Sequence, residues 1–344
     1  MFILPCCAIS SPGMLTLATY IHHLDPVITE IPGTPLALRW YGLAYVGGFV
    51  LGYYVLRLLS ERRLFCVEPN KLGDFVTLIC IFGVLLGGRL GEFFFYWLPE
   101  QGLSGFLNDP TWVIRVWEGG MASHGGIICV IITALWYARR HQLSAAQIID
   151  GLAIVSPIGL FLGRVANFIN GELYGRPAPA DSLLSVKFPL EIFELQPQQQ
   201  IQAIVSMEHA AGNSLKALAQ PHEAFYDTFS RICRESEAAR EALGQFLTPR
   251  YPSQLFEAIG EGLVIFITLI TIRLMWKNAP AGLFAALFAF MYAAARITCE
   301  CFKQPDAWVW HGITQGQLLS LVIVLLGIPF LISAIRNYQK QKNL

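Results

Sequence analysis

Charged residues are scarce in this 344-residue chain: Asp, Glu, Lys and Arg make up only 14% of it, whereas hydrophobic residues make up 54%. A soluble globular domain carries about 25% charged residues. The mean hydropathy of +0.50 points the same way. This composition excludes a disordered chain and argues against a soluble enzyme. The 24 basic residues balance the 24 acidic residues, so no overall positive field is present to attract nucleic acid.

Motifs for metal or hydrolytic chemistry are also missing. The eight cysteines include no Cys-x-x-Cys pair, so neither a zinc site nor a redox motif is indicated. His222-Glu223 is followed by Tyr226 where zinc spacing requires a second His, and no Gly-x-Ser-x-Gly occurs. An intramembrane protease is therefore disfavoured. No repeat of 20–50 residues is present either.

The chain contains long runs of uncharged, mainly apolar residues. A helix needs about 20 mainly apolar residues to cross a bilayer. The sequence therefore predicts an all-α polytopic membrane protein with about seven transmembrane helices. The predicted spans are residues 40–58, 75–97, 119–138, 147–169, 255–274, 280–300 and 313–335.

Lys and Arg are distributed unevenly between the short loops that join these spans. Cytoplasmic loops of membrane proteins carry an excess of basic residues. One alternate set of loops holds eleven Lys and Arg, whereas the opposite set holds only Arg39, Arg115 and Lys303. We therefore expect the N-terminus outside and the C-terminus in the cytoplasm. The eleven are Arg57, Arg62, Arg63, Lys71, Arg139, Arg140, Arg273, Lys277, Arg336, Lys340 and Lys342.

One segment between the predicted spans is much longer than the others. It is polar, yet apolar residues recur in it, with amphipathic helices expected near 198–211 and 223–246. We therefore expect an extracytoplasmic α-rich subdomain here. Residues 1–38 contain no Lys or Arg, which argues against a signal peptide and leaves both Met1 and Met14 open as the start. The predicted parts are an extracytoplasmic N-terminal segment (1–38), four transmembrane helices (39–172), the subdomain (173–252), three further transmembrane helices (253–336) and a cytoplasmic tail (337–344).

Polar residues inside the spans gather at one depth. On the predicted topology five spans direct ionisable side chains toward the outer leaflet, and Asp150 is the main exception. A charge within a membrane span is costly and normally faces a partner or a wet cavity. We therefore predict a polar cavity that opens to the outer leaflet. Its candidate residues are Tyr41, Arg89, Glu92, His124, Arg164, Asn167, Glu257, Glu261, Tyr292, Arg296 and Glu300.

Two of these acidic residues need partners of opposite charge. Glu257 and Glu261 are four apart, so on one helix their like charges repel. They need cationic partners from other helices, and Arg164 or Arg296 is able to supply them. Arg296 and Glu300 are also four apart, which allows a simple structural pair within one helix.

Two segments favour an anion-binding function. His124 lies in Ser-His-Gly-Gly (123–126) at a helix start, where backbone N–H groups favour anions and the glycines allow close approach. A lone helical His is more often structural. Residues 163–177 pack two Arg, two Asn, one Glu and three Gly at a membrane boundary. Because Arg binds phosphate through a planar fork and stays charged when partly buried, a phospholipid headgroup is the predicted ligand.

These residues resemble a known family, the bacterial prolipoprotein diacylglyceryl transferases. The resemblance extends over about residues 24–335, with the segment at 163–175 as its most specific part. Phe256 and Lys303 replace an expected Tyr and Arg, Glu92 replaces an uncharged residue, and the segment 176–250 is longer than usual. The other matching segments are Leu38-Arg39-Trp40-Tyr41-Gly42, Gly87-Gly88-Arg89-Leu90-Gly91, Ser123-His124-Gly125-Gly126, residues 251–257, Tyr292, Arg296, Glu300 and residues 302–306.

The resemblance implies a reaction and a location. Such an enzyme moves the diacylglyceryl group of phosphatidylglycerol to the lipobox cysteine of a prolipoprotein, which forms a thioether and releases glycerol phosphate. This is the first step of lipoprotein maturation. The resemblance implies no metal and no organic cofactor. It implies a multi-pass protein of the bacterial cytoplasmic (inner) membrane whose active site faces the outer leaflet, with the membrane, phosphatidylglycerol and prolipoproteins as partners and no nucleic acid.

The predicted site residues follow from this chemistry. Arginines stabilise the charge that grows on the departing phosphate. A thiol reacts as its thiolate and has an ordinary pKa of about 8.5, so a base or an orienting group is needed. The expected catalytic residues are His124, Arg164 and Arg296. The expected substrate-binding residues are Tyr41, Arg89, Asn167, Glu172, Gly175, Tyr292 and Glu300.

An anion- or proton-coupled membrane transporter is the alternative. Intramembrane Arg, Glu, His and Asn are able to form a transport path. Such a path also needs polar residues through the inner half of the membrane, where only Asp150 qualifies.

Overall fold

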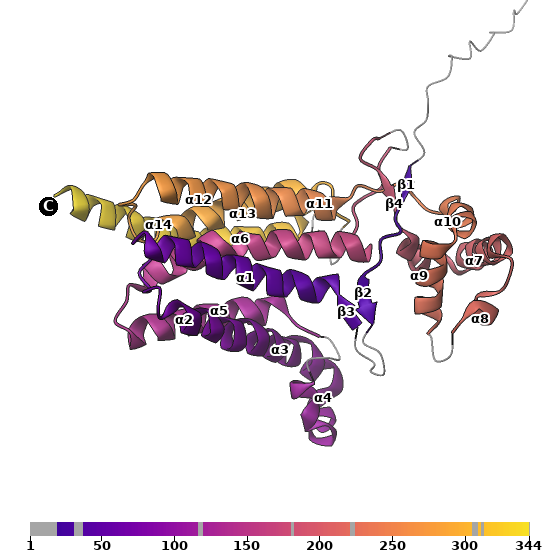
Figure 1. The fold of residues 1–344 in the computed structure, drawn as a ribbon, viewed down its shortest axis with the longest axis horizontal. Helices are drawn as coiled ribbons and strands as arrows, with labels where there is room; N and C mark the ends of the chain where they lie inside the picture. The colour runs from indigo at the N-terminus through magenta and orange to yellow at the C-terminus, as the bar shows by residue number, and fades with distance from the viewer. Residues whose placement is uncertain are drawn as a thin grey trace, which may run out of the picture. The chain divides into compact units, whose positions relative to one another are not determined.

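Figure 1 shows the computed structural model, which describes residues 19–30, 37–115, 120–179, 182–220, 224–304, 309–310 and 313–343. The chain divides into two compact units. One comprises Met1–Asp25 and Asn170–Ser253, and the other comprises Pro26–Ile169 and Gln254–Leu344. The predicted start at Met1 or Met14 lies outside the described residues.

The second unit, called the helical unit below, holds the long apolar helices. Six helices in the described part of the chain are long and apolar enough to cross a membrane. By length and composition, they make this a polytopic, mainly α-helical membrane protein. The six are Trp40–Glu61 (α1), Leu72–Gly102, Ala145–Asn170 (α6), Ser253–Met275, Leu283–Glu300 (α13) and Gln315–Lys342 (α14).

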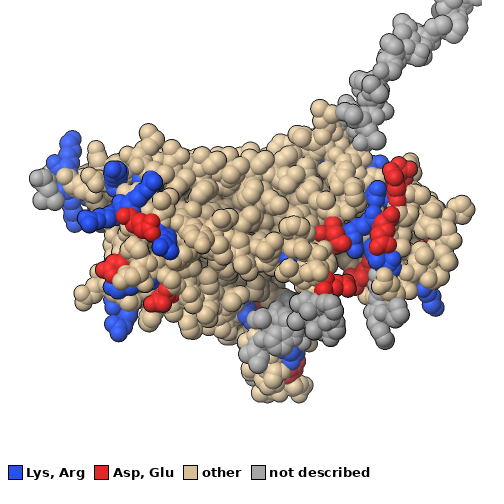
Figure 2. Space-filling model, in the orientation of Figure 1, with Lys and Arg blue, Asp and Glu red and all other residues tan. Residues whose placement is uncertain are grey.

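The predicted third span corresponds to α5 (Ser123–Arg140), an 18-residue helix outside that set of six. The count of seven spans and their orientation therefore stay predictions. In Figure 2 the flank of the helical unit is almost free of charged side chains, and Lys and Arg, with some Asp and Glu among them, gather at the end where α14 finishes. An uncharged flank of this kind is typical of a surface that faces lipid.

Two of the six helices are built from several consecutive elements. The helix Leu72–Gly102 comprises α2 (Leu72–Leu78), the π-helical η1 (Ile79–Leu85), α3 (Leu86–Glu92), the π-helical η2 (Phe93–Trp97) and the start of α4 (Leu98–Asn108). The helix Ser253–Met275 comprises α11 (Ser253–Glu257), the π-helical η6 (Ala258–Val264) and α12 (Ile265–Met275). Shorter elements are β2 (Val27–Glu30), which pairs with β3 (Ala37–Arg39), the 3-10 helix η3 (Pro110–Ile114), and β5 (Val309–Trp310), which pairs with β6 (Ile313–Thr314).

Two apolar clusters hold the helical unit together. Leu56, Phe75 and Tyr137 belong to a cluster that joins α1, α2, α5 and α6. Ile154 and Phe284 belong to a second cluster that joins α1, α6, α12 and α13. Lipid is as apolar as the surface of a membrane helix, so burial of apolar surface does not drive helices together. Helices in a membrane attract one another mainly through close packing, which small residues permit.

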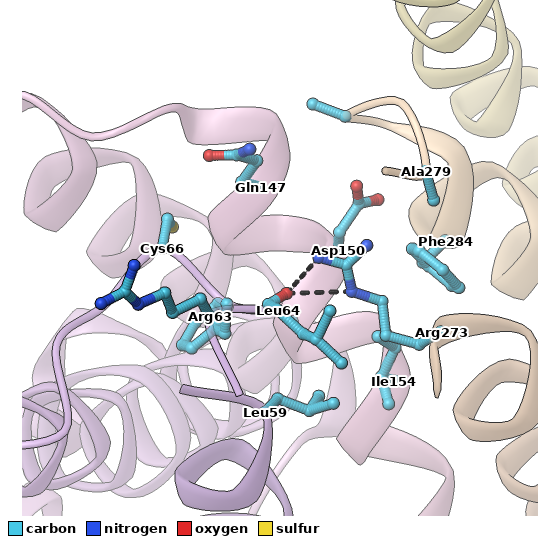
Figure 3. A pocket seen from close by; sticks show the side chains of 13 residues that line it. Leu59, Arg63, Leu64, Cys66, Gln147, Asp150, Ile154, Arg273, Ala279 and Phe284 are labelled. Carbon is cyan, nitrogen blue, oxygen red and sulfur yellow. Dashed lines mark hydrogen bonds between the residues drawn. The ribbon is translucent and has the colours of Figure 1, made fainter. Parts of the chain in front are cut away.

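Asp150, the exception to the outer clustering, caps a helix. Its Oδ2 accepts a hydrogen bond from the backbone N–H of Gly282 (2.7 Å) and its Oδ1 accepts one from Ala285 (2.8 Å). These donors lie at the start of α13, where backbone N–H groups lack partners within the helix. Asp150 also lines a cavity of about 100 Å³. Figure 3 shows two other residues that line it, Arg273 and Leu64, with Arg273 donating to the Leu64 carbonyl. The buried aspartate therefore has a structural explanation.

The first unit is a small helical subdomain. Its elements are β1 (Tyr20–Ile21), which pairs in parallel with β4 (Val186–Lys187), the 3-10 helix η5 (Pro189–Glu194), α7 (Pro197–Ala211), α8 (Leu215–Leu218), α9 (Phe225–Glu235) and α10 (Glu237–Gly244). Ile192, Met207 and Phe229 are fully buried in its core. The helix expected near 223–246 is two helices, because Ser236 leaves the helical conformation and its hydroxyl accepts from the N–H of Ala239 to start α10.

Candidate functional site

Two arginines and two glutamates form a buried cluster in the helical unit. Glu257 bridges the arginines, with Oε2 3.1 Å from Arg164 Nη1 and Oε1 2.5 Å from Arg296 Nη1. Glu261 does the same, with Oε2 3.6 Å from Arg164 Nη2 and Oε1 3.2 Å from Arg296 Nη1. The prediction that Arg164 or Arg296 partners the glutamates is confirmed, and both arginines do so. Like charges four residues apart are tolerated because opposite charges lie within contact distance.

Burial is unequal within this Arg–Glu cluster. The side chains of Glu257 and Glu261 are completely buried, whereas those of Arg164 and Arg296 are 19% and 13% exposed. Of these four side chains, only the two arginines therefore keep surface that a bound molecule is able to contact. An arginine held in this way offers a fixed fork for a phosphate or another oxyanion.

Close helix packing brings the four charges together. A Cβ atom on Gly262 would lie 2.7 Å from the Cα of Phe161, so η6 touches α6 backbone to backbone. A Cβ on Gly260 would lie 3.5 Å from the sulfur of Cys299, so η6 also touches α13. Because η6 packs against both helices, Glu257, directly before η6, and Glu261, in its middle, reach the arginines of α6 and α13. Glycine allows this close approach, as small residues do elsewhere in membrane helix contacts.

Glu300 extends the cluster by one carboxylate. Its Oε2 lies 3.3 Å from Nη2 of Arg296, so the pair expected at four-residue spacing is confirmed. The carboxylate also lies against the first turn of α14, where a Cβ on Gly316 would be 2.8 Å from Glu300 Oε2. The positive end of the helix dipole favours a carboxylate at this place. Arg296 is thus held from two sides.

Arg89 is buried and holds a loop. Its guanidinium donates to the carbonyl oxygens of Trp112 (2.5 Å), Val113 (3.1 Å), Arg115 (3.0 Å) and Gly120 (3.0 Å). It also lies 3.8 Å from the ring centroid of Trp112, a cation–π contact. These contacts tie α3 to the segment that leads into α5. Its predicted contact with lipid stays a prediction.

His124 lies in the first turn of α5, and its side chain is exposed. Of the two glycines after it, Gly125 is used differently from the expectation. A Cβ on Gly125 would lie 2.3 Å from the carbonyl oxygen of Gly87 and 2.4 Å from the Cα of Gly91. Gly125 therefore packs α5 against α3, and backbone approach by another molecule is not its role. The crossing fixes where the start of α5 lies, and so fixes His124.

Three polar candidates lie in the same helices as the arginines or in α1. Asn167 is buried, almost one turn beyond Arg164 on α6. Tyr292 is half-buried one turn before Arg296 on α13, with its ring stacked on Phe288 at 5.7 Å. Tyr41 lies half-buried in the first turn of α1. Their contacts with a substrate stay predictions.

Glu172 and Gly175 belong to the subdomain. Glu172 accepts a hydrogen bond from Asn170 Nδ2 at 3.4 Å. Gly175 donates its N–H to the carbonyl of Tyr251 (2.9 Å), and its own carbonyl accepts from Arg250 (3.2 Å). The backbone of Gly175 is therefore fixed from both sides.

The subdomain contains a buried ion pair that the motif analysis missed. Nη2 of Arg250 lies 2.7 Å from Oε1 of Glu191, and the carboxylate also accepts from the N–H of Thr248. Nearby, burial and the hydrogen bond that the Tyr174 hydroxyl donates to Glu194 raise the pKa of Tyr174. Arg250 and Glu191 lie 59 residues apart, so no local spacing indicated them.

The described residues contain no group of three or more His, Cys, Asp or Glu side chains placed to hold a metal ion. The Arg–Glu cluster places two guanidinium groups, both paired with the same two carboxylates, inside a helical membrane protein.

Fold and site define the class: a polytopic membrane protein in which buried carboxylates hold two partly exposed arginines. The chain belongs to the prolipoprotein diacylglyceryl transferase family, whose model matches residues 26–333. A phosphatidylglycerol–prolipoprotein diacylglyceryl transferase of Bdellovibrio bacteriovorus is 38% identical over 333 residues, which cover 91% of this chain and 93% of the relative. Enzymes of the same name from Proteus mirabilis (36% identical; 92% and 93% covered) and Azospirillum brasilense (35%; 93% and 98%) are also similar.

Proposed function

We propose that this enzyme transfers the diacylglyceryl group of phosphatidylglycerol to the lipobox cysteine of a prolipoprotein. The cysteine sulfur forms a bond to a glycerol carbon of the lipid, and the bond from that carbon to the phosphate oxygen breaks. The products are a thioether and glycerol phosphate. The names of the relatives cited above describe this enzyme activity, and they support it for a chain that matches them over nine-tenths of its length.

One observation carries the chemical argument: two guanidinium groups lie side by side on the same two carboxylates. The phosphate gains negative charge as its bond to the glycerol carbon breaks. Arg164 and Arg296, both partly exposed, would bind that phosphate and stabilise the added charge. Donors fixed before the reaction are the most effective, because they need no reorganisation as the charge develops.

The incoming thiol must lose a proton, and we propose His124 for this step or for orienting the headgroup. An ordinary thiol has a pKa of about 8.5 and reacts as the thiolate. His124 is exposed at the start of α5, as a base for an incoming peptide must be. Tyr41, Asn167 and Tyr292 would hold the lipid, and Arg89 would act by fixing the loop before α5. Glu172, Gly175 and Glu300 would complete the binding residues.

We place the site toward the outer leaflet of the bacterial inner membrane, with the subdomain outside the cytoplasm. The uneven distribution of Lys and Arg between the loops supports this orientation. The substrate partners are the lipid and a prolipoprotein with its lipobox cysteine; nucleic acid has no part in the reaction. A transporter would need polar residues through the inner half of the membrane. Asp150 was the one candidate there, and its carboxylate instead caps α13.

A direct assay tests the proposal. Purified protein in detergent receives phosphatidylglycerol labelled in its diacylglyceryl part and a lipobox peptide. We expect thioether-linked label on the peptide, and none when Arg164→Ala protein or a peptide with Ser in place of Cys is used. A folded preparation that binds the lipid but transfers no label would overturn the proposal. Uptake by proteoliposomes would then be measured next.

A further inference from the structure

Glu257 and Glu261 share an arrangement that ordinary ion pairs lack. Each carboxylate gives one oxygen to Arg164 and the other to Arg296, at 2.5–3.6 Å. In simple ion pairs, each glutamate would neutralise a single arginine. Two bridging carboxylates instead fix the distance between two like-charged guanidinium groups, which otherwise repel each other.

We propose that Glu257 and Glu261 are positioning residues for the transfer reaction: they set the spacing of the two phosphate-binding arginines and weaken their hold on the lipid before reaction. This inference rests on the function proposed above. Both glutamates are completely buried beside partly exposed arginines, so they act through Arg164 and Arg296 rather than by touching the substrate.

The charges explain why such residues would suit this reaction. Two guanidinium groups and two carboxylates cancel, and Glu300 adds a further negative charge at Arg296. A phosphodiester headgroup must therefore compete with internal carboxylates for the same donors, which limits its binding in the ground state. The extra negative charge of the departing phosphate interacts more strongly with the same donors. Binding that is stronger in the transition state than in the ground state is what accelerates a reaction.

The two parts of the proposal predict separable effects on kcat and KM. Glu261→Gln keeps the shape of the side chain but removes its charge and one of its two acceptor oxygens. We expect kcat to fall by about tenfold or more, because one arginine loses its fixed place; removal of a comparable fixed donor costs about 100-fold or more. We expect KM for phosphatidylglycerol to fall, because less negative charge competes with the headgroup.

Glu261→Asp is the matched variant, since it keeps the charge but is too short to bridge both arginines. It should lower kcat as well, without lowering KM. Glu257→Gln is the second test of the charge, because Glu257 bridges the same two arginines, and it should repeat the kcat and KM changes of Glu261→Gln. Both constants are measured with the label-transfer assay and divided by the amount of folded protein, determined by size-exclusion chromatography and thermal unfolding.

The wild-type enzyme separates this proposal from the one on which it rests. Absence of transfer by the folded wild type would overturn the function itself. Transfer by the wild type, with kcat and KM per folded molecule unchanged in the glutamine variants, would overturn only the positioning role. A rise of KM in Glu261→Gln would also contradict it, because the competing charge has been removed.

Discussion

Replacing Gly125 by alanine tests how the helix contact below His124 is built. The added Cβ would lie 2.3 Å from the carbonyl oxygen of Gly87 and 2.4 Å from the Cα of Gly91. Ordinary carbon contacts begin near 3.5 Å, so α5 and α3 must separate by about 1 Å. The atoms in the way are backbone, so no side chain can turn aside.

The magnitude follows from two opposing effects. Extra methyl groups in a well-packed core cost about 1–3 kcal/mol, and rigid backbone neighbours place this case at the upper end, about 3 kcal/mol. Alanine is favoured over glycine inside a helix by about 1 kcal/mol. The net expectation for Gly125→Ala is a loss of about 2 kcal/mol in the free energy of unfolding. Activity should fall too, because a 1 Å displacement near a reaction can cost about 100-fold.

The next residue provides the control. A Cβ on Gly126 would meet only Val84 and Gly88 backbone atoms at 3.9 and 4.0 Å, which is ordinary contact. Gly126→Ala should therefore keep or raise the stability by up to about 1 kcal/mol. Unfolding of both variants is followed by circular dichroism in detergent with added denaturant. Equal stability of Gly125→Ala and wild type, or equal losses in both variants, would refute the packing argument.

Further predictions concern three single residues, Arg89, Cys233 and His124. Arg89→Lys replaces a fork that reaches four carbonyl oxygens by a single ammonium, so backbone amides near Trp112 should exchange hydrogen faster; unchanged exchange would contradict the holding role. Burial raises the pKa of Cys233 to about 12, so alkylation at pH 8 should be slow at Cys233 and fast at the exposed Cys301; equal rates would disprove its burial. Because folding raises that pKa, subdomain stability should fall as the pH rises from about 8.5 toward 12. His124→Gln should change the pH–rate profile of transfer, and an identical profile would exclude His124 as the base.

Much of the charged cluster was predictable from sequence, because membrane burial makes charges informative. Glu257 and Glu261 repel on one helix, so the need for cationic partners, with Arg164 or Arg296 as candidates, followed from the sequence. The bridging geometry did not follow, because it depends on π-helical turns in η6 and on contacts between glycines and neighbouring backbones. Such contacts produce no periodic pattern of residues that a sequence would reveal.

Other features were misjudged for related reasons. Gly125 was expected to admit a ligand, yet its lack of a side chain serves contact with α3, and one sequence does not separate these uses. The break at Ser236 was hidden because the hydrophobic pattern continues from α9 into α10. Asp150 looked like a candidate for transport, since its backbone partners at Gly282 and Ala285 lie more than 130 residues away.

The most direct test measures both products of one reaction. Purified enzyme is given phosphatidylglycerol and a lipobox peptide, and mass spectrometry follows diacylglyceryl-peptide and glycerol phosphate in the same samples. We expect equal amounts of the two products from wild type, and neither from Arg164→Ala. Glycerol phosphate without modified peptide, or full transfer by Arg164→Ala, would contradict the assignment of this site to diacylglyceryl transfer.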